Sequence, residues 1–408
     1  MLKIRRRSHV PQAPEAIEAP RPGSPPIICI GKDWEGDPTS NTHFMRLLSR
    51  RNRVLWVNSI GTRRPGVNRR DLGRLLYKFR RAFDGCAQVA PNMHVFNPLV
   101  VPFPELPGVA RFNSTFLSAA LRRTSERLGF ERPLMWTYFP TAVGLVGRLR
   151  ECAVIYHCID DYAEFPGVNG AALRRAEQQL LKVADLVVTS SEILWRERRQ
   201  ENPRTFFIPH GVDVDHFSRA LDPGLRVPMD VGGLPRPIVG YFGLIADYVD
   251  LELIAEAARM QPHWSFVLVG GWATSLRALS GLANVHLLGR RPYDSLPGYC
   301  RAFDVGVIPF RMNALTVRVN PIKLREYLAA GLPVVSTPLP EVARYRALVH
   351  LADSPKMFVE EIERALGERS EPFLAQRLLA MRAESWESRV GEVCRLIRDT
   401  LGLRLGLP

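Results

Sequence analysis

A lysine and a glutamate three residues apart, Lys323 and Glu326, stand just after a proline that suits the start of a helix. Pro321 fits the first helical position, and Asn320 before it is a good N-cap. A helix N-terminus disfavours a lysine in its first turn unless an anion lies between them, so a phosphate would relieve the conflict. Glu326 falls on the same helix face, where it can bind hydroxyl groups. The spacing therefore predicts a site for a phosphate and a hydroxyl-bearing group, as in a sugar nucleotide.

The chain before this helix is basic. No aspartate or glutamate occurs from residue 305 to residue 325, whereas four basic residues do: Arg311, Arg318, Lys323 and Arg325. Gly243, at the end of an apolar run, either lets a diphosphate approach the backbone or serves a purely steric role. No basic residue follows it in GLIADYVD, so neutralisation of a phosphate falls to Arg318 and Lys323. Arg290, at another strand end, is either a base or phosphate contact or a surface charge.

A second group of polar residues lies in the first half of the chain. In AVIYHCIDDYAEFPG, the residues His157, Asp160 and Asp161 stand at or just after the end of an apolar strand. A carboxylate there can bind sugar hydroxyls or stabilise an oxocarbenium-like transition state. Asp161 is equally well explained as a helix N-cap, and His157 as a buried histidine. The loop GKDWEGDPTSNTH offers side chains that suit a sugar acceptor: Trp34, Asn41 and His43.

Strands and helices alternate nearly throughout, which predicts an α/β protein with two doubly wound, Rossmann-like domains of parallel strands. We expect a basic, proline-rich arm over 1–24, an acceptor-binding domain over 25–221, a linker over 222–237 and a nucleotide-sugar-binding domain over 238–385. The last segment, 386–408, is helical and has no sheet of its own, so we expect it to pack back on the first domain. Ligands of such sheets bind at the carboxyl ends of the strands, which places the chemistry in a cleft between the domains.

The net charge of +14 is unevenly distributed, because residues 46–81 are rich in arginine and hold a single acid. The segment 71–83, DLGRLLYKFRRAF, has the pattern of an amphipathic helix at an anionic membrane surface, although a solvated surface helix explains it equally well. No motif indicates a nucleic-acid partner, and no apolar run is long enough to span a bilayer. We therefore expect a cytoplasmic protein, peripheral to the inner face of the plasma membrane if the basic segment binds lipid. No set of residues indicates a metal, a P-loop or a serine hydrolase.

Three segments resemble one known family, the nucleotide-sugar glycosyltransferases of the GT-B fold, and within them the retaining family 4 type. FFIPHGVDVDHF is similar to the signature before the interdomain linker, and NPIKLREYLAAGLPVVSTP to the nucleotide-binding helix and strand. VHLLGRRPYDSLPGYCRAFDVGVIPF is similar to the region that contacts the base. The resemblance is greatest to the branch that builds bacterial cell-surface polysaccharides, including teichuronic acid-type transferases.

The resemblance implies transfer of a sugar, with retention, from a UDP- or GDP-sugar to a lipid-linked saccharide or polysaccharide. It implies that the leaving diphosphate takes the proton of the acceptor, so that no strong protein base is required. The nucleotide-sugar is a substrate, and we expect neither a cofactor nor a metal. Glu326 matches the second glutamate of the family's Glu-x7-Glu motif, whereas Arg318 stands where the first belongs. That departure leaves a second reading open, a catalytically inactive sugar-nucleotide-binding or scaffold subunit of a polysaccharide-assembly complex. If the chain is active, we expect Lys323, together with Arg318, to contact the diphosphate.

Overall fold

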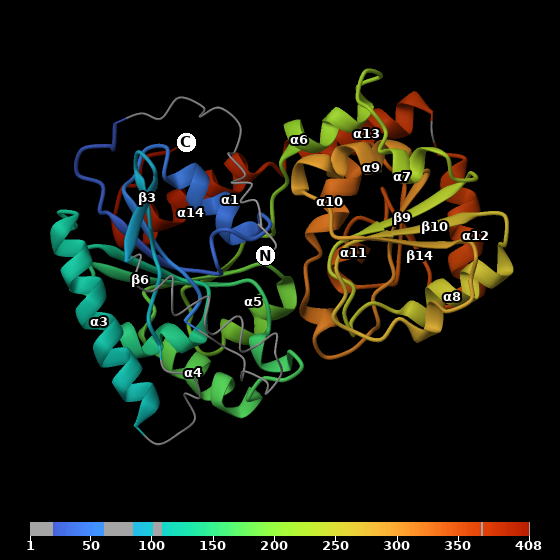
Figure 1. The fold of residues 1–408 in the computed structure, drawn as a ribbon. Helices are drawn as coiled ribbons and strands as arrows, with labels where there is room; N and C mark the ends of the chain where they lie inside the picture. Colours follow the sequence, from blue (N-terminus) through green and yellow to red (C-terminus); the bar gives the residue numbers. More distant parts are fainter. Residues whose placement is uncertain (1–18, 61–84, 101–107, 369, 408) are drawn as a thin grey trace, which may run out of the picture.

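The computed structural model describes residues 19–60, 85–100, 108–368 and 370–407, which form two α/β domains side by side (Figure 1). The predicted fold class, two doubly wound Rossmann-like domains, is confirmed. The amphipathic segment 71–83 and most of the 1–24 arm lie outside the described residues.

The first domain is built on a sheet with the strand order β3-β4-β2-β1-β5-β6-β7-β8. Its strands are β1 Ile27–Ile30, β2 Val54–Val57, β3 Cys86–Ala90, β4 Met93–Phe96, β5 Leu134–Thr137, β6 Ala153–Cys158, β7 Leu186–Thr189 and β8 Thr205–Phe207. The inner strands pair in parallel and are fully buried, as their continuous apolar sequences predict. The sequence analysis missed β3, which pairs antiparallel with β4 at the sheet edge and is exposed along most of its length. An exposed edge strand carries no apolar run.

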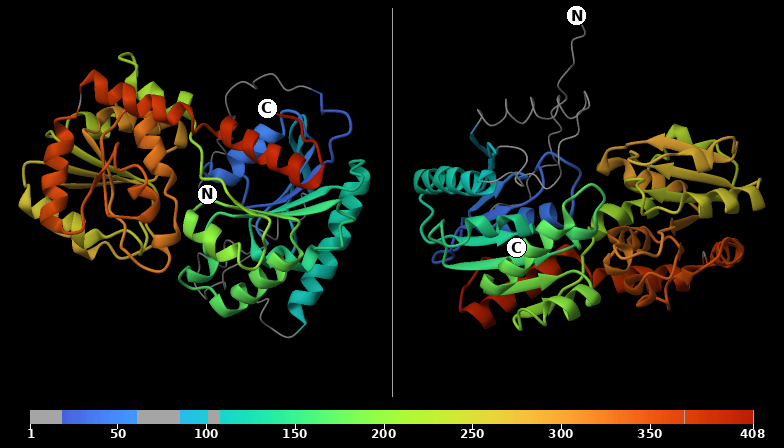
Figure 2. Two further views of the ribbon diagram at one scale, coloured as in Figure 1. Left: turned by 180° about the vertical axis from the view of Figure 1, so that it is seen from behind. Right: turned by 90° about the horizontal axis from the view of Figure 1, so that it is seen from below.

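Helices cover both faces of this sheet. They are α1 Ser40–Leu48, α3 Val109–Arg127, α4 Gly170–Val183 and α5 Glu192–Arg198, joined by the last helix of the chain, α14 Trp386–Leu401. Figure 2 shows α14 lying on the first domain, where it packs against α1. Its buried side chains belong to the core of that domain, because Trp386, Val390 and Ile397 cluster with the strand residues of β1 and β2.

The second domain has a parallel sheet with the order β11-β10-β9-β12-β13-β14. Its strands are β9 Ile238–Phe242, β10 Ser265–Val269, β11 Val285–Gly289, β12 Val305–Ile308, β13 Val334–Ser336 and β14 His350–Leu351. Its helices are α6 Val214–Ser218, α7 Met229–Gly232, α8 Leu251–Met260, α9 Leu296–Ala302, α10 Ile322–Ala329, α11 Pro340–Ala343, α12 Pro355–Leu366 and α13 Glu371–Arg382. Each strand of this sheet coincides with an apolar run of the sequence.

The chain passes between the domains twice, and the two crossings lie against each other. The N–H of Val212 donates to the carbonyl of Glu384 at 3.0 Å, and the N–H of Trp386 donates to the carbonyl of Val212 at 3.2 Å. The first crossing comes earlier than the linker predicted at 222–237, because Phe217 and Ala220 already belong to the core of the second domain. The glycines and prolines of the 222–237 stretch indicated an irregular segment, but not the domain to which α6 belongs.

An ion-pair network joins the two domains at Arg318, which ends the short 3-10 helix Thr316–Arg318. Its Nη2 lies 2.7 Å from Oε1 of Glu197, and its Nε lies 3.5 Å from Oδ2 of Asp161. Arg198 extends the network, since its Nη2 lies 3.5 Å from the same Asp161 carboxylate and 3.0 Å from Glu177. We call this set of five residues the interdomain clasp. Only Arg318 in it comes from the second domain.

Asn320 makes a second interdomain contact. Its side-chain amide donates to the carbonyl of Ser190 at 2.7 Å, and its Oδ1 accepts from Arg325 at 2.6 Å. The prediction that Asn320 caps the following helix was wrong by one residue, because Pro321 holds the N-cap position and α10 begins at Ile322. The Oδ1 atom that would have capped the helix accepts from Arg325 instead, and the amide nitrogen binds the first domain.

The clasp predicts a measurable loss of stability in Arg318→Ala. The arginine side chain is 23% exposed and pairs with carboxylates of which Asp161 is 3% exposed. Breaking a partly buried pair should cost about 1–2 kcal/mol, or a fall of about 2–6 °C in the melting temperature. The control is Arg196→Ala, since Arg196 is 69% exposed and pairs with Glu192 within one helix. Equal melting temperatures for the two variants in differential scanning fluorimetry would show that the clasp contributes nothing to stability.

Candidate functional site

The loops that follow the carboxyl ends of the strands in the two domains face one another. Arg290, after β11, forms an ion pair at 3.0 Å with Asp37 in the loop that follows β1. Asp160, after β6, lies close enough to Tyr248 of the second domain to contribute to raising the pKa of that phenol, which burial and Asp160 together bring to about 12. The predicted cleft between strand ends is therefore the place where polar side chains of both domains meet.

On the second-domain side, Lys323 packs against the turn at Gly243. A Cβ atom added at Gly243 would lie 3.3 Å from Cε and 3.5 Å from Nζ of Lys323, and the glycine has φ +128°. The ammonium group lies over the rings of Phe310 and Tyr241, at 4.8 Å and 5.3 Å from their centroids. These contacts place the first turn of α10 beside the end of β9. The sequence singled out both Gly243 and Lys323, and the structure brings them together.

Glu326 shares this environment, and its charge is coupled to that of Lys323. Burial lowers the pKa of Lys323 to about 8, although the Glu326 carboxylate opposes the shift. Burial raises the pKa of Glu326 to about 7, with Lys323 opposing the shift and Asp213 adding to it. Burial disfavours the charged form of both groups, so a ligand that pairs with either charge would stabilise that form. The pair can offer a cation to phosphate and an acceptor to hydroxyl groups.

A second glycine completes the turn. Gly270, after β10, has φ +158°, and a Cβ atom there would lie only 1.8 Å from the carbonyl oxygen of Gly243. Any larger residue would force the two turns apart. The backbones at the ends of β9 and β10 therefore approach closely, and no side chain at either position covers Lys323.

On the first-domain side, Asp160 is the carboxylate directed at the cleft. Burial raises its pKa to about 6, the nearby Lys32 opposes this shift, and Asp161 adds to it. Lys32 follows β1 and was not singled out from the sequence. Its place at a strand carboxyl end is the signal that could have found it. The pair supplies a carboxylate with a cation beside it, opposite Tyr248.

Asp161 has a different environment from its neighbour. It caps the 3-10 helix Tyr162–Glu164, accepting from the N–H of Ala163 at 3.3 Å, and it belongs to the interdomain clasp. With 3% exposure, its carboxylate is already occupied by arginines. The N-cap interpretation of Asp161 thus describes its observed contacts.

His157 lies just behind the cleft in an aromatic cluster. It stacks on Tyr138 at 4.9 Å and meets Phe44 edge to face at 5.0 Å, and burial lowers its pKa to about 3. The imidazole is therefore neutral at physiological pH. Within the described ranges, Nδ1 of His157, the Tyr138 hydroxyl and Nδ2 of Asn41 have no hydrogen-bond partner. Three buried polar groups with unused hydrogen-bonding capacity thus border the acceptor side.

The other predicted acceptor residues take part in packing. Trp34 meets Trp56 edge to face at 5.1 Å and lies under the guanidinium of Arg46 at 5.3 Å. His43 stacks on Trp386 at 5.1 Å, and burial lowers its pKa to about 3. Both residues lie beside the domain boundary, but their rings are partly used by these contacts.

Over residues 19–60, 85–100, 108–368 and 370–407, no three His, Cys, Asp or Glu side chains gather in a way that could hold a metal ion. Among the helices in those same ranges, none is long and apolar enough to cross a bilayer.

A family model matches most of the second domain. Residues 236–368 match the family model described as Glycosyl transferases group 1, a span that includes β9 and α10. A curated relative, TuaH of Bacillus subtilis, is 28% identical over 279 residues, which cover 63% of this chain and 69% of the relative. The name of that relative provisionally assigns it to teichuronic acid biosynthesis as a glycosyltransferase.

Solved structures share the fold over nearly the whole chain. An α,α-trehalose-phosphate synthase (UDP-forming) from Burkholderia vietnamiensis superposes with a TM-score of 0.64 at 16% identity, covering 93% of this chain and 100% of its own. HepE from Anabaena, solved in complex with UDP-glucose, gives a TM-score of 0.62 at 14% identity, covering 91% of this chain and 99% of its own. Both likenesses extend across the two domains. Residues 236–368 thus form a glycosyl transferases group 1 domain within a GT-B fold, and the chain is a glycosyltransferase.

Proposed function

We propose that this glycosyltransferase moves a sugar, with retention, from a UDP- or GDP-sugar on the second domain to a lipid-linked saccharide or polysaccharide on the first. The observation that carries the proposal is the contact of Lys323 with the glycine turn at Gly243, at the carboxyl end of β9, together with the electrostatic interaction between Lys323 and Glu326. The Bacillus relative, whose name points to teichuronic acid, and the Anabaena structure with UDP-glucose support a role in cell-surface polysaccharide biosynthesis.

The donor contacts divide between helix and turn. The ammonium group of Lys323 faces the diphosphate near the glycine backbone, and the Glu326 carboxylate accepts hydrogen bonds from the ribose hydroxyls. Arg290, at the end of β11, is close to the base. Arg318 and Asn320, expected among the donor contacts, bind Glu197 and Ser190 across the domain boundary. We therefore infer that Arg318 and Asn320 position α10, and that Lys323 neutralises the charge of the diphosphate.

Asp160 is the proposed catalytic residue on the acceptor side. As the bond between the anomeric carbon and the diphosphate breaks, positive charge develops on the sugar ring. The Asp160 carboxylate, held between Lys32 and Tyr248, can stabilise that charge. The acceptor oxygen bonds to the anomeric carbon on the face that the diphosphate leaves, and a diphosphate oxygen takes the acceptor proton. This reaction needs no protein base and no metal, because Lys323 supplies the cation at the leaving group.

The coupled pair predicts a bell-shaped pH dependence of UDP affinity. Below pH 7 Glu326 gains a proton and loses its role as a hydroxyl acceptor, whereas above pH 8 Lys323 loses the charge that attracts the diphosphate. The dissociation constant measured by calorimetry should therefore be smallest between these values. Lys323→Met should weaken binding about ten- to hundredfold and abolish the alkaline limb, and Glu326→Gln should abolish the acidic limb.

Glu256→Gln is the matched control, since Glu256 is exposed on α8. If Lys323→Met and Glu326→Gln leave the affinities for UDP and GDP at the level of this control, the donor site lies elsewhere.

If Asp160 is catalytic, replacing it should lower the reaction rate without weakening nucleotide binding. Asp160→Asn removes the negative charge but keeps the shape of the side chain, so we expect donor hydrolysis without acceptor to fall about a hundredfold. The dissociation constant for UDP should stay within twofold, because the group faces the sugar and not the nucleotide. In the wild type, the rate should fall below pH 6, where the carboxyl gains its proton. Wild-type turnover by the variant would remove Asp160 from the mechanism.

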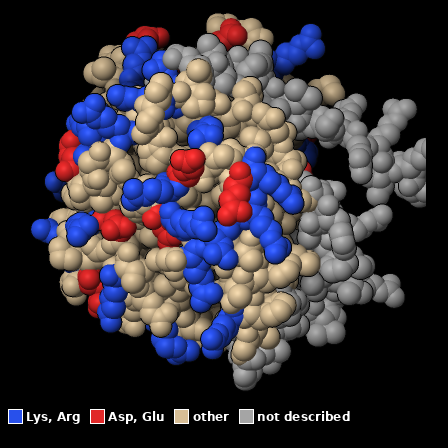
Figure 3. Space-filling view, turned by 90° about the vertical axis from the view of Figure 1, so that its left-hand side faces the viewer, with Lys and Arg blue, Asp and Glu red and all other residues tan. Residues whose placement is uncertain are grey.

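A lipid-linked acceptor requires access to the membrane surface. Helix α3 exposes the side chains of Phe112 and Phe116 by 58% and 47%, and the two rings stack at 6.1 Å. Arg111 and Arg123 are also exposed on this helix, and Figure 3 shows Lys and Arg gathered on the same side of the first domain. Exposed aromatic rings beside cations are typical of a surface that binds anionic lipid. This supports a peripheral position on the cytoplasmic face of the membrane.

Liposome flotation tests this position. The double variant Phe112→Ser with Phe116→Ser should bind vesicles containing phosphatidylglycerol several times more weakly than the wild type. The control is Phe373→Ser, because Phe373 is 42% exposed on α13 of the second domain. Equal flotation of both proteins would exclude α3 as the membrane contact.

A further inference from the structure

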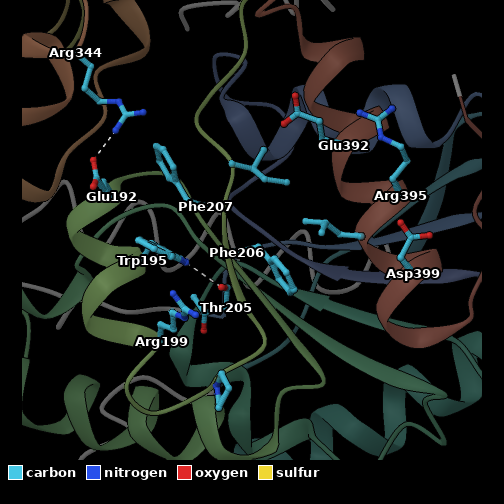
Figure 4. A pocket seen from close by; sticks show the side chains of 13 residues that line it. Glu192, Trp195, Arg199, Thr205, Phe206, Phe207, Arg344, Glu392, Arg395 and Asp399 are labelled. Carbon is cyan, nitrogen blue, oxygen red and sulfur yellow. Dashed lines mark hydrogen bonds and ion pairs between the residues drawn. The ribbon is translucent and has the colours of Figure 1, made fainter.

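A pocket of about 760 Å³ opens at the free edge of the first sheet, beside the last strand, β8 (Figure 4). Helix α5 borders it on one side and α14 on the other, and Arg344 reaches it from the second domain. None of the residues assigned above to the donor or to catalysis lines it. We call it the edge groove.

Aromatic side chains form much of the edge groove. Trp195 comes from α5, and Phe206 and Phe207 both come from β8. All three are only partly buried, so their rings remain accessible. The indole N–H of Trp195 donates to the carbonyl of Thr205 at 3.1 Å, which fixes the ring along the strand edge.

Arginines from three elements surround these rings. The guanidinium of Arg199 lies over Trp195 at 5.1 Å, and that of Arg344 lies over Phe207 at 5.0 Å. Arg395 approaches from α14 on the opposite side, as Figure 4 shows. Across the described residues, no carboxylate forms an ion pair with Arg199 or Arg395, and both side chains are exposed.

The groove also holds three carboxylates, but arginines already neutralise them. Their ion pairs are Glu192 with Arg196 and Arg344 at 2.5 Å each, Glu392 with Arg389 at 3.0 Å, and Asp399 with Arg398 at 2.8 Å. Three of these partners, Arg196, Arg389 and Arg398, do not line the groove. In the described part of the chain, Arg199 and Arg395 form no such ion pair, so their guanidinium groups are the charges offered to a ligand. Arg395 lies near Asp399, where it adds to the lowering of that carboxyl's pKa by Arg398.

The edge of β8 is a poor template for a peptide strand. A peptide that extends the sheet needs free backbone donors and acceptors along the edge. The carbonyl of Thr205 already accepts the Trp195 indole, and Pro203 has no N–H to donate. The rings and cations are a better match for sugars that carry carboxylates, because flat aromatic faces pack on pyranose rings and guanidinium groups bind carboxylates in a bidentate manner.

We propose that the edge groove binds a segment of an acidic oligosaccharide, outside the cleft in which transfer takes place. The proposal rests on the proposed function, since such a site would hold the saccharide acceptor, here one that carries carboxylates, while its end is extended. Arg344 belongs to the second domain and the other lining residues to the first domain and α14. A bound chain would therefore contact both domains where the polypeptide crosses between them.

Calorimetry with two defined probes tests the proposal. The full-length protein should bind hexagalacturonate, with an affinity that falls as salt is raised, and should bind neutral maltohexaose at least tenfold more weakly. The double variant Arg199→Ala with Arg395→Ala should lose at least tenfold in affinity for hexagalacturonate and keep its affinity for UDP. A charge reversal, Arg395→Glu, provides a second variant with the same expected direction.

The matched control is Arg259→Ala with Arg277→Ala, which removes two exposed arginines from the second domain. The proposal is overturned if hexagalacturonate does not bind at millimolar concentration, or if the control loses as much affinity as the groove variant. It is also overturned if sedimentation shows a dimer that the groove variants dissociate, because the groove is then a contact between copies of the chain. Failure of UDP binding in the wild type would count against the donor site and would leave the hexagalacturonate result unaffected.

Discussion

The position of the first turn of α10 depends on contacts with the first domain. Arg318 and Asn320 bind Glu197 and the carbonyl of Ser190, and Lys323 follows within a few residues. A cation so close to a helix N-terminus is unfavourable in itself. The interdomain contacts hold it there, against the glycine turn after β9. The proposed donor site is thus built by the second domain, and contacts with the first domain position its helix.

This arrangement links the two domains energetically. A movement that opens the cleft must break the Arg318 pairs or bend the chain between Arg318 and Lys323. The crossings at Val212 and Trp386, hydrogen-bonded to each other, restrict where such bending can occur. A domain movement would therefore alter the contacts that position Lys323 in the proposed donor site. A bound diphosphate that neutralises Lys323 would stabilise the domain arrangement to which the diphosphate binds.

Local patterns of the sequence predicted what depends on local structure. Buried parallel strands such as β9 and β10 are continuous apolar runs, and the spacing of Lys323 and Glu326 places them on one helix face whatever surrounds it. Contacts between distant segments could not be read in this way. Arg318 and Glu197 are 121 residues apart, and Asn320 and Ser190 are 130 apart, so the sequence around one residue does not indicate its partner. Lys32 differs, because its place at a strand end could have been noticed in the sequence, whereas its proximity to Asp160 depends on the fold.

Arg318 illustrates why a single departure from a family motif is not an isolated change. The resembled family has a glutamate at this position, whereas here the side chain faces the carboxylates of Asp161 and Glu197. A glutamate at 318 would meet like charges in a partly buried place, where the charged forms repel and their pKa values rise. A glutamate could return to this position only if Glu197 and Asp161 changed with it. The residues of the clasp therefore form one unit, in which an arginine at position 318 fits the two carboxylates that it pairs with across the domain boundary.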